Sequence, residues 1–237
     1  MIKFGVGASV VGAILVIALA GCAPAVHPHH SAHGPGPTAS ATRTPIPTKP
    51  ALADIVLSPD GLGDVVLNAP VPPTTFLFTY NATECVSTET GVTAGSPFAG
   101  AWRAAYPAVD PANPDQLPFI LSNTPQTTAG PVTYVWVWSP GVHTAAGIQV
   151  GSTRAEVLAA YPHADAVTHG VLSDVYVITG SVGKLVIEVA RADSGDVGYW
   201  PPGQVDTVLW MGAVQHSDPA PAIAGTDGGP STCPTNA

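Results

Sequence analysis

The sequence is short of charge, and above all of positive charge. Lysine, arginine, aspartate and glutamate make up 10% of its 237 residues, against about 25% in a typical globular protein. Seven of the charged residues are basic and 16 are acidic, which gives a net charge of −9. A chain with this balance lacks the basic surface with which proteins bind nucleic acid. We therefore expect no nucleic-acid partner.

Familiar catalytic motifs are also missing. The sequence contains no His-Glu-x-x-His, no phosphate loop and no dinucleotide fingerprint. A serine-hydrolase elbow needs Gly-x-Ser-x-Gly, but around Ser181 a threonine, Thr179, stands where the first glycine belongs. This segment is better interpreted as a loop. The absence of these motifs favours a protein that binds a partner or ligand over an enzyme.

The first 21 residues have the pattern of an export signal. Lys3 supplies a positive charge, and residues 10–20 form an apolar run that ends in small residues. The last residues of this run belong to the Leu-Ala-Gly-Cys sequence at positions 19–22. This ending resembles the lipobox of bacterial lipoproteins. The resemblance implies that the leader, residues 1–21, is removed before Cys22 and that Cys22 carries diacylglycerol on its sulfur.

Two acyl chains hold a protein at a membrane stably, whereas one chain does so only marginally. The resemblance therefore implies a lipid-anchored protein on the extracytoplasmic face of the cell membrane. The alternative is an uncleaved membrane helix, since residues 4–21 contain no charge and a span needs about 20 residues. The charged start and short apolar core fit a signal better.

Residues 22–50 are predicted to form a disordered linker. Seven prolines fall between positions 23 and 50, with serine, threonine, glycine and histidine among them and little that can pack. Four histidines lie within this linker, and their ring nitrogens are suitable ligands for Zn, Cu or Ni. They are His27, His29, His30 and His33. The alternative is a polar spacer that happens to contain histidine.

Residues 51–237 are long enough for one domain or for two packed halves, 51–130 and 131–237. All 16 acidic residues lie in this part, opposed by four basic ones, so its net charge is −12. Anionic lipid repels such a domain, and the linker allows the domain to lie at a distance from the membrane surface. We therefore expect a cell-wall or protein partner outside the membrane.

Cys85 and Cys233 remain in the exported part. Two thiols in an exported chain most simply form one disulfide. The alternative is a free, reactive thiol pair, although neither cysteine stands in a Cys-x-x-Cys redox spacing. A disulfide would tie the end of the chain back to its first half.

Hydrophobic periodicity predicts a strand-rich α+β domain with antiparallel sheets and one or two short helices. A strand over residues 133–138 would place three aromatic residues on one face and Thr133 with two valines on the other. A glycine-containing connection, 179–183, suggests a hairpin between neighbouring strands. The expected strands cover residues 55–57, 65–67, 76–80, 119–121, 133–138, 175–178, 184–189 and 205–211.

One helix is predicted after Thr153, because Thr153 and Glu156 form a capping-box pattern. Its buried face would consist of Val157, Leu158 and Tyr161, and Pro162 would end it. The string over residues 147–157 resembles the opening of BamE-like and β-lactamase-inhibitor-protein-like domains. This resemblance implies short helices before an antiparallel meander and carries no active site across. Leader, linker and acidic domain together resemble lipoproteins of actinobacteria.

An internal echo joins residues 102–110 and 157–165, which share Ala-Ala-Tyr-Pro followed by an aspartate. A decayed duplication and coincidence in an alanine-rich chain both explain it.

Titratable residues gather after the predicted helix. A pocket that united His163, Asp165 and His169 would hold a metal or a general base, and the alternative is a solvated loop. Four tryptophans suggest either an aromatic ligand platform or core packing, namely Trp136, Trp138, Trp200 and Trp210. The leading hypothesis is a lipid-anchored, non-enzymatic envelope protein that binds a protein or small ligand. The alternatives are an extracytoplasmic hydrolase and metal capture by the histidine tract.

Overall fold

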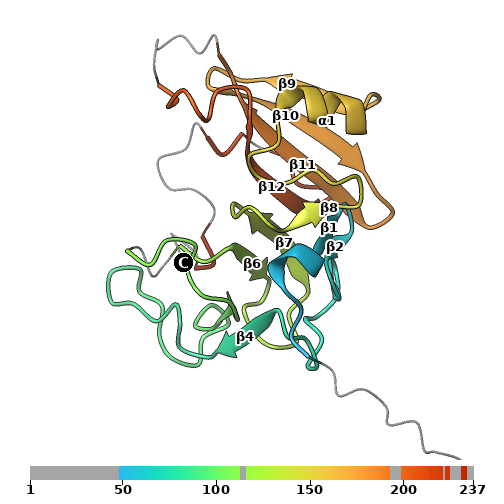
Figure 1. Ribbon diagram of the computed structural model, residues 1–237. Helices are drawn as coiled ribbons and strands as arrows, with labels where there is room; N and C mark the ends of the chain where they lie inside the picture. Colours follow the sequence, from blue (N-terminus) through green and yellow to red (C-terminus); the bar gives the residue numbers. More distant parts are fainter. Residues whose placement is uncertain (1–47, 113–115, 193–198, 221, 225–230, 234–237) are drawn as a thin grey trace, which may run out of the picture. The chain divides into compact units, whose positions relative to one another are not determined.

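Runs of β-branched and aromatic residues form most of the strands in the computed structural model (Figure 1), which describes residues 48–112, 116–192, 199–220, 222–224 and 231–233. These residues belong to one compact unit, Ile46–Ala237. Cys22 and the histidine tract lie outside the described residues, so their predicted roles stay predictions. Among the described helices, none has the length and apolar character needed to cross a membrane.

An eight-stranded antiparallel sheet dominates the fold, in the order β4-β5-β6-β7-β12-β11-β10-β9. Residues on both sides of position 130 contribute strands to it. The strands are β4 (Phe78–Asn81), β5 (Ala101–Ala104), β6 (Phe119–Asn123), β7 (Val132–Val137), β9 (Ala166–His169), β10 (Ser173–Thr179), β11 (Gly183–Ala190) and β12 (Val208–Gln215). The predicted hairpin is confirmed, since β10 and β11 pair in register across the turn after Thr179.

A smaller sheet has the order β3-β2-β1-β8. Its strands are β1 (Val56–Ser58), β2 (Gly61–Leu62), β3 (Val65–Val66) and β8 (His143–Thr144), and a short 3-10 helix, η1 (Leu52–Asp54), precedes β1. Strand β8 runs parallel to β1, whereas β2 and β3 are antiparallel to their neighbours.

The main core lies between the two sheets. Leu57 and Leu62 of the small sheet share one buried cluster with Val135 and Val137 of β7. Trp136, with its half-buried neighbours Tyr134 and Trp138, belongs to a second cluster on the other face of the large sheet. The predicted alternation in β7 is therefore confirmed. Ala220 and Ile223 near the chain end cover this second face.

Within the described residues the structure has one α-helix, α1 (Arg154–Ala160), which begins where the capping box predicted it. Thr153 Oγ1 accepts the N–H of Glu156, and a Glu156 carboxylate oxygen accepts the N–H of Thr153 at 2.7 Å. Val157 is buried and Tyr161 packs against the core. Leu158 does not, because 48% of its surface is exposed. The expectation of a buried Leu158 was wrong, since the short helix turns one narrow stripe inward.

Four strands were not predicted from the sequence. The short strands β2 and β8 belong to the small sheet, β5 contains Trp102 and ends at Ala104, and β9 ends at His169 in a segment expected to be a loop. The first Ala-Ala-Tyr-Pro sequence of the echo thus begins at the last residue of a strand, while the second begins in the last turn of the helix α1. The echo therefore marks no repeated structural unit.

The sulfur atoms of Cys85 and Cys233 lie at disulfide distance, with their Cα atoms 5.3 Å apart. Cys85 is 5% exposed. The predicted pairing thus agrees with the fold, in which residues 231–233 lie against the region of β6 and β7: the hydroxyl of Tyr134 donates to the carbonyl of Ser231 at 2.6 Å.

Candidate functional site

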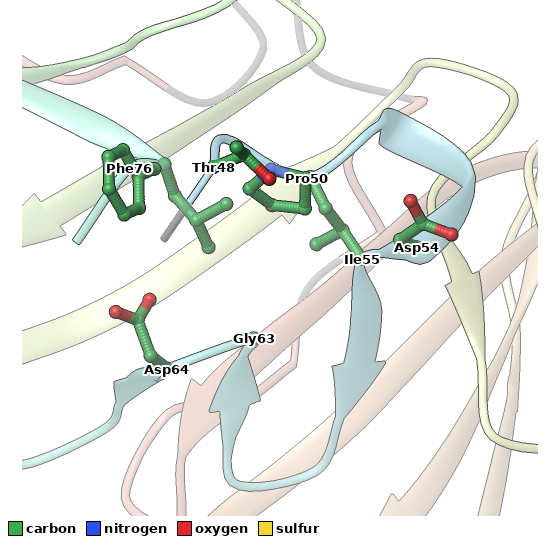
Figure 2. A pocket seen from close by; sticks show the side chains of 8 residues that line it. Thr48, Pro50, Asp54, Ile55, Gly63, Asp64 and Phe76 are labelled. Atoms are coloured by element: carbon green, nitrogen blue, oxygen red, sulfur yellow. The ribbon is translucent and has the colours of Figure 1, made fainter. Parts of the chain in front are cut away.

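A hollow of about 300 Å³ opens where the chain enters the domain (Figure 2). Its walls come from the residues before β1, from the turn between β2 and β3, and from the segment that leads into β4. The lining residues are Thr48, Pro50, Asp54, Ile55, Gly63, Asp64, Phe76 and Leu77. In Figure 2, Phe76 and Asp64 stand on one side and Asp54 on the other, with Pro50 and Ile55 between them.

Buried Tyr106 holds the first wall in place. Its hydroxyl donates to the carbonyl of Pro50 at 2.9 Å, and the ammonium of Lys49 lies 3.9 Å from its ring centre. The same ammonium donates to the carbonyl of Ala105. Residues 48–50, predicted to belong to the linker, are thus attached to the domain. Thr48 and Pro50, at the end of this predicted linker, form part of the hollow.

The second wall depends on a tight turn at Gly63. Its φ of +57° is a left-handed conformation that favours glycine. A Cβ atom at this position would also lie 2.9 Å from Leu77 Cδ1, which forms part of the floor. The hydroxyl of Thr75 donates to Asp64 Oδ1 at 2.8 Å and ties this turn to the third wall.

Each of the two lining carboxylates accepts one hydrogen bond, through one of its oxygens. Asp54 Oδ2 accepts the N–H of Ala51 at 3.3 Å, and Asp64 Oδ1 accepts from Thr75. The structure records no further hydrogen bond for either side chain, and neither forms an ion pair with a described residue. Burial, and then the negative charges of Asp54 and Asp64, raise the pKa of Tyr106. The field of both carboxylates therefore reaches the ring beneath Lys49.

The described basic residues beyond Lys49 are occupied elsewhere. Arg103 pairs with Glu84, the ammonium of Lys184 donates to the carbonyl of Asp218, and both Arg154 and Arg191 lie against Asp174. The hollow thus combines an apolar floor with negative charge that no described arginine neutralises.

A second hollow of about 130 Å³ lies beside Cys233. Residues 231–233 form one of its sides, where the Gln126 side-chain amide donates to the carbonyl of Thr232. Phe98 forms part of its rim. This space is smaller than the range of about 300–1,000 Å³ that ligand pockets usually have.

The three residues expected to form a metal or base site are spread along the chain rather than gathered. His163 is exposed after α1, Asp165 precedes β9 and His169 ends it. Asp165 lies at a bend before β9 and His169 is the last residue of this strand, so the length of β9 separates them. Asp165 instead accepts the N–H of Thr179, a bond that lowers the pKa of its carboxyl. In the part of the chain that the structure describes, no three His, Cys, Asp or Glu side chains are placed to hold a metal ion.

His169 takes part in a different arrangement. Its Nδ1 lies 2.7 Å from Asp174, whose carboxylate is 8% exposed and also receives the guanidinium of Arg154. Arg154 donates in addition to Asp206 at 2.8 Å, to the hydroxyl of Tyr176 and to the carbonyl of Ala190, both at 2.9 Å. This network joins the first residue of α1 to β10, β11 and the approach to β12. These contacts hold neighbouring elements together, which is a structural role.

The tryptophans divide between two places. Trp136 is 4% exposed, and Trp138 and Trp210 meet edge to face with ring centres 5.4 Å apart on the same side of the large sheet. Trp200 instead donates its indole N–H to the carbonyl of Leu172 at 2.7 Å. The four rings therefore do not form one platform.

No protein-family model matches this chain, and neither does a curated protein or a solved structure. The function of this chain is therefore inferred from its own residues. Sequence reasoning missed the hollow beside β1, although the Gly-Leu-Gly-Asp run at 61–64 indicates a tight turn. The meeting of that turn with Pro50 and Phe76 has no signal in the sequence, because it joins three separate segments.

Proposed function

We propose that this protein is a lipid-anchored lipoprotein of the cell envelope, attached through Cys22, whose domain is a non-enzymatic module that binds a ligand outside the membrane. The observation that carries the proposal is the hollow lined by Ile55, Leu77 and Phe76 with Asp54 and Asp64 at its sides. A concave apolar surface with a few polar groups is the common form of a ligand site.

The position of the hollow supports this function. Thr48 and Pro50 line it, and they follow the residues that resemble a linker behind a lipobox. A flexible chain of 27 residues, the number from Cys22 to Thr48, has an average span of about 30 Å. A ligand in the hollow would then be held clear of the lipid headgroups, close to the point where the linker enters the domain.

The anchor is tested by fatty-acid labelling in a bacterial host. We expect the unchanged chain to incorporate labelled palmitate and Cys22→Ala to incorporate none, because the acceptor sulfur is gone. The matched control is the double variant Cys85→Ala/Cys233→Ala, which keeps the lipobox and should label normally. Label that persists in Cys22→Ala would contradict the lipobox interpretation.

Binding is tested with the full chain purified from membranes in detergent. Ligand-observed NMR with a set of small cations, anions and neutral aromatic molecules should find binders that Phe76→Ala loses, since Phe76 is 43% exposed and forms a wall of the hollow. Phe98→Ala is the matched control, with 40% exposure beside the smaller hollow. If no compound binds, or if both variants lose the same compounds, the proposal fails.

A further inference from the structure

We propose that the hollow beside β1 recognises a small organic cation, an ammonium group carried on a compact apolar body. This inference rests on the proposed binding function and names its ligand class. It follows from the lining residues, the free carboxylate oxygens and the size of the space.

The carboxylates determine the sign of the ligand charge. Asp54 and Asp64 each keep acceptor capacity on the wall of the hollow, and neither is paired with a described cation. An ammonium group supplies N–H donors and a positive charge to both. An anionic ligand would meet two like charges and is disfavoured.

The apolar lining determines the rest of the ligand. Ile55 and Leu77 are 2% and 3% exposed and form a buried floor, whereas Phe76 presents 43% of its surface. An exposed aromatic ring attracts a cation at its face. Burial of a hydrocarbon body against the apolar floor contributes a binding free energy of about 25 cal/mol per Å². A fully hydrated metal ion would make little use of this floor.

Size separates a small molecule from a large one. The volume of about 300 Å³ equals that of about ten water molecules. One aromatic ring with an aminomethyl group fits such a space. The negative charge of the domain, with 16 acidic and four basic residues over positions 51–237, raises the local concentration of cations.

Calorimetric titration of the full chain in detergent tests this proposal with three matched probes: benzylammonium, benzyl alcohol and phenylacetate. We expect benzylammonium to bind most tightly and phenylacetate not at all. The double variant Asp54→Asn/Asp64→Asn should bind benzylammonium roughly tenfold more weakly. Glu89→Gln, which removes an exposed acid outside the hollow, should bind normally.

The outcomes separate this inference from the proposed function. If benzyl alcohol binds as tightly as benzylammonium, or if the double variant binds benzylammonium normally, the cation assignment is overturned while a binding hollow remains. If Nα-acetyl-lysine amide binds more tightly than benzylammonium, the ligand is a protein side chain and the small-molecule assignment is overturned. If neither these probes nor any compound of the NMR set binds, the proposed function fails as well.

Discussion

Glu188 shows how one buried carboxylate organises a face of the large sheet. It is 1% exposed, and its carboxylate accepts the N–H groups of Ile223 at 2.8 Å and Ala224 at 2.9 Å together with the hydroxyl of Ser173. Burial raises the pKa of Glu188, while these hydrogen bonds act in the opposite direction. The side chain thus fastens the segment near the chain end over the second core cluster.

The raised pKa of Glu188 predicts a specific pH dependence of stability. Between the ordinary value of 4.5 and the raised value, the folded state binds more protons than the unfolded state, so stability falls as pH rises through this window. Glu188→Gln removes this titration, although its amide loses an acceptor and costs about 1–3 kcal/mol. The free energy of unfolding of the wild type minus that of Glu188→Gln should therefore decrease as pH rises from 4.5. Urea unfolding over a pH series measures it, and a flat difference would contradict the assignment.

Among the elements, the pairing of β7 with β12 depends on a glycine beneath an aromatic ring. Gly212 stands opposite Trp136 in the register of these strands. A Cβ atom on Gly212 would lie 2.4 Å from the indole ring, which is itself buried. Glycine weakens a strand in general, but here its missing side chain leaves the space that the ring fills.

We expect Gly212→Ala to lower the free energy of unfolding by about 1–3 kcal/mol, because the indole must move within a packed core. Gly203→Ala is the control, since a Cβ atom there meets nothing within 4 Å. It should change stability by less than about 0.5 kcal/mol. Thermal unfolding of both variants compares them, and equal effects would show that the ring does not constrain position 212.

The elements that could be predicted are those with local causes. The start of α1 was predicted because Thr153 and Glu156 bond to each other's backbone within one turn, and the hairpin of β10 and β11 because glycines flank its connection. Strand β9 was missed, since its exposed residues Val167 and Thr168 form a strand only by pairing with β10. The outward position of Leu158 was not foreseen either, because the packing of α1 against the core decides which stripe of the helix is buried.

Across the whole molecule, the pair Cys85 and Cys233 links positions separated by 148 residues. Closing so long a loop restricts the unfolded chain, and the chain-entropy model gives a stabilisation of up to about 5 kcal/mol. We expect Cys233→Ala to unfold at lower urea concentration than the wild type and to show no response to reductant. The wild type should approach the variant when reductant is added. Identical midpoints for the wild type with and without reductant would show that the thiols are not bonded.

The sequence alone determined what arises from neighbours along the chain: the lipobox-like ending at Cys22, the proline-rich composition of the linker, the acidic balance of the domain, the capped helix and the alternation in β7. Tertiary structure decided which distant residues meet. It separated Asp165 from His169 along β9, and it brought Pro50, Asp64 and Phe76 around one hollow. The physical reason is that the local sequence pattern indicates which side chains prefer to be buried. A site, in contrast, depends on long-range packing that no single segment specifies.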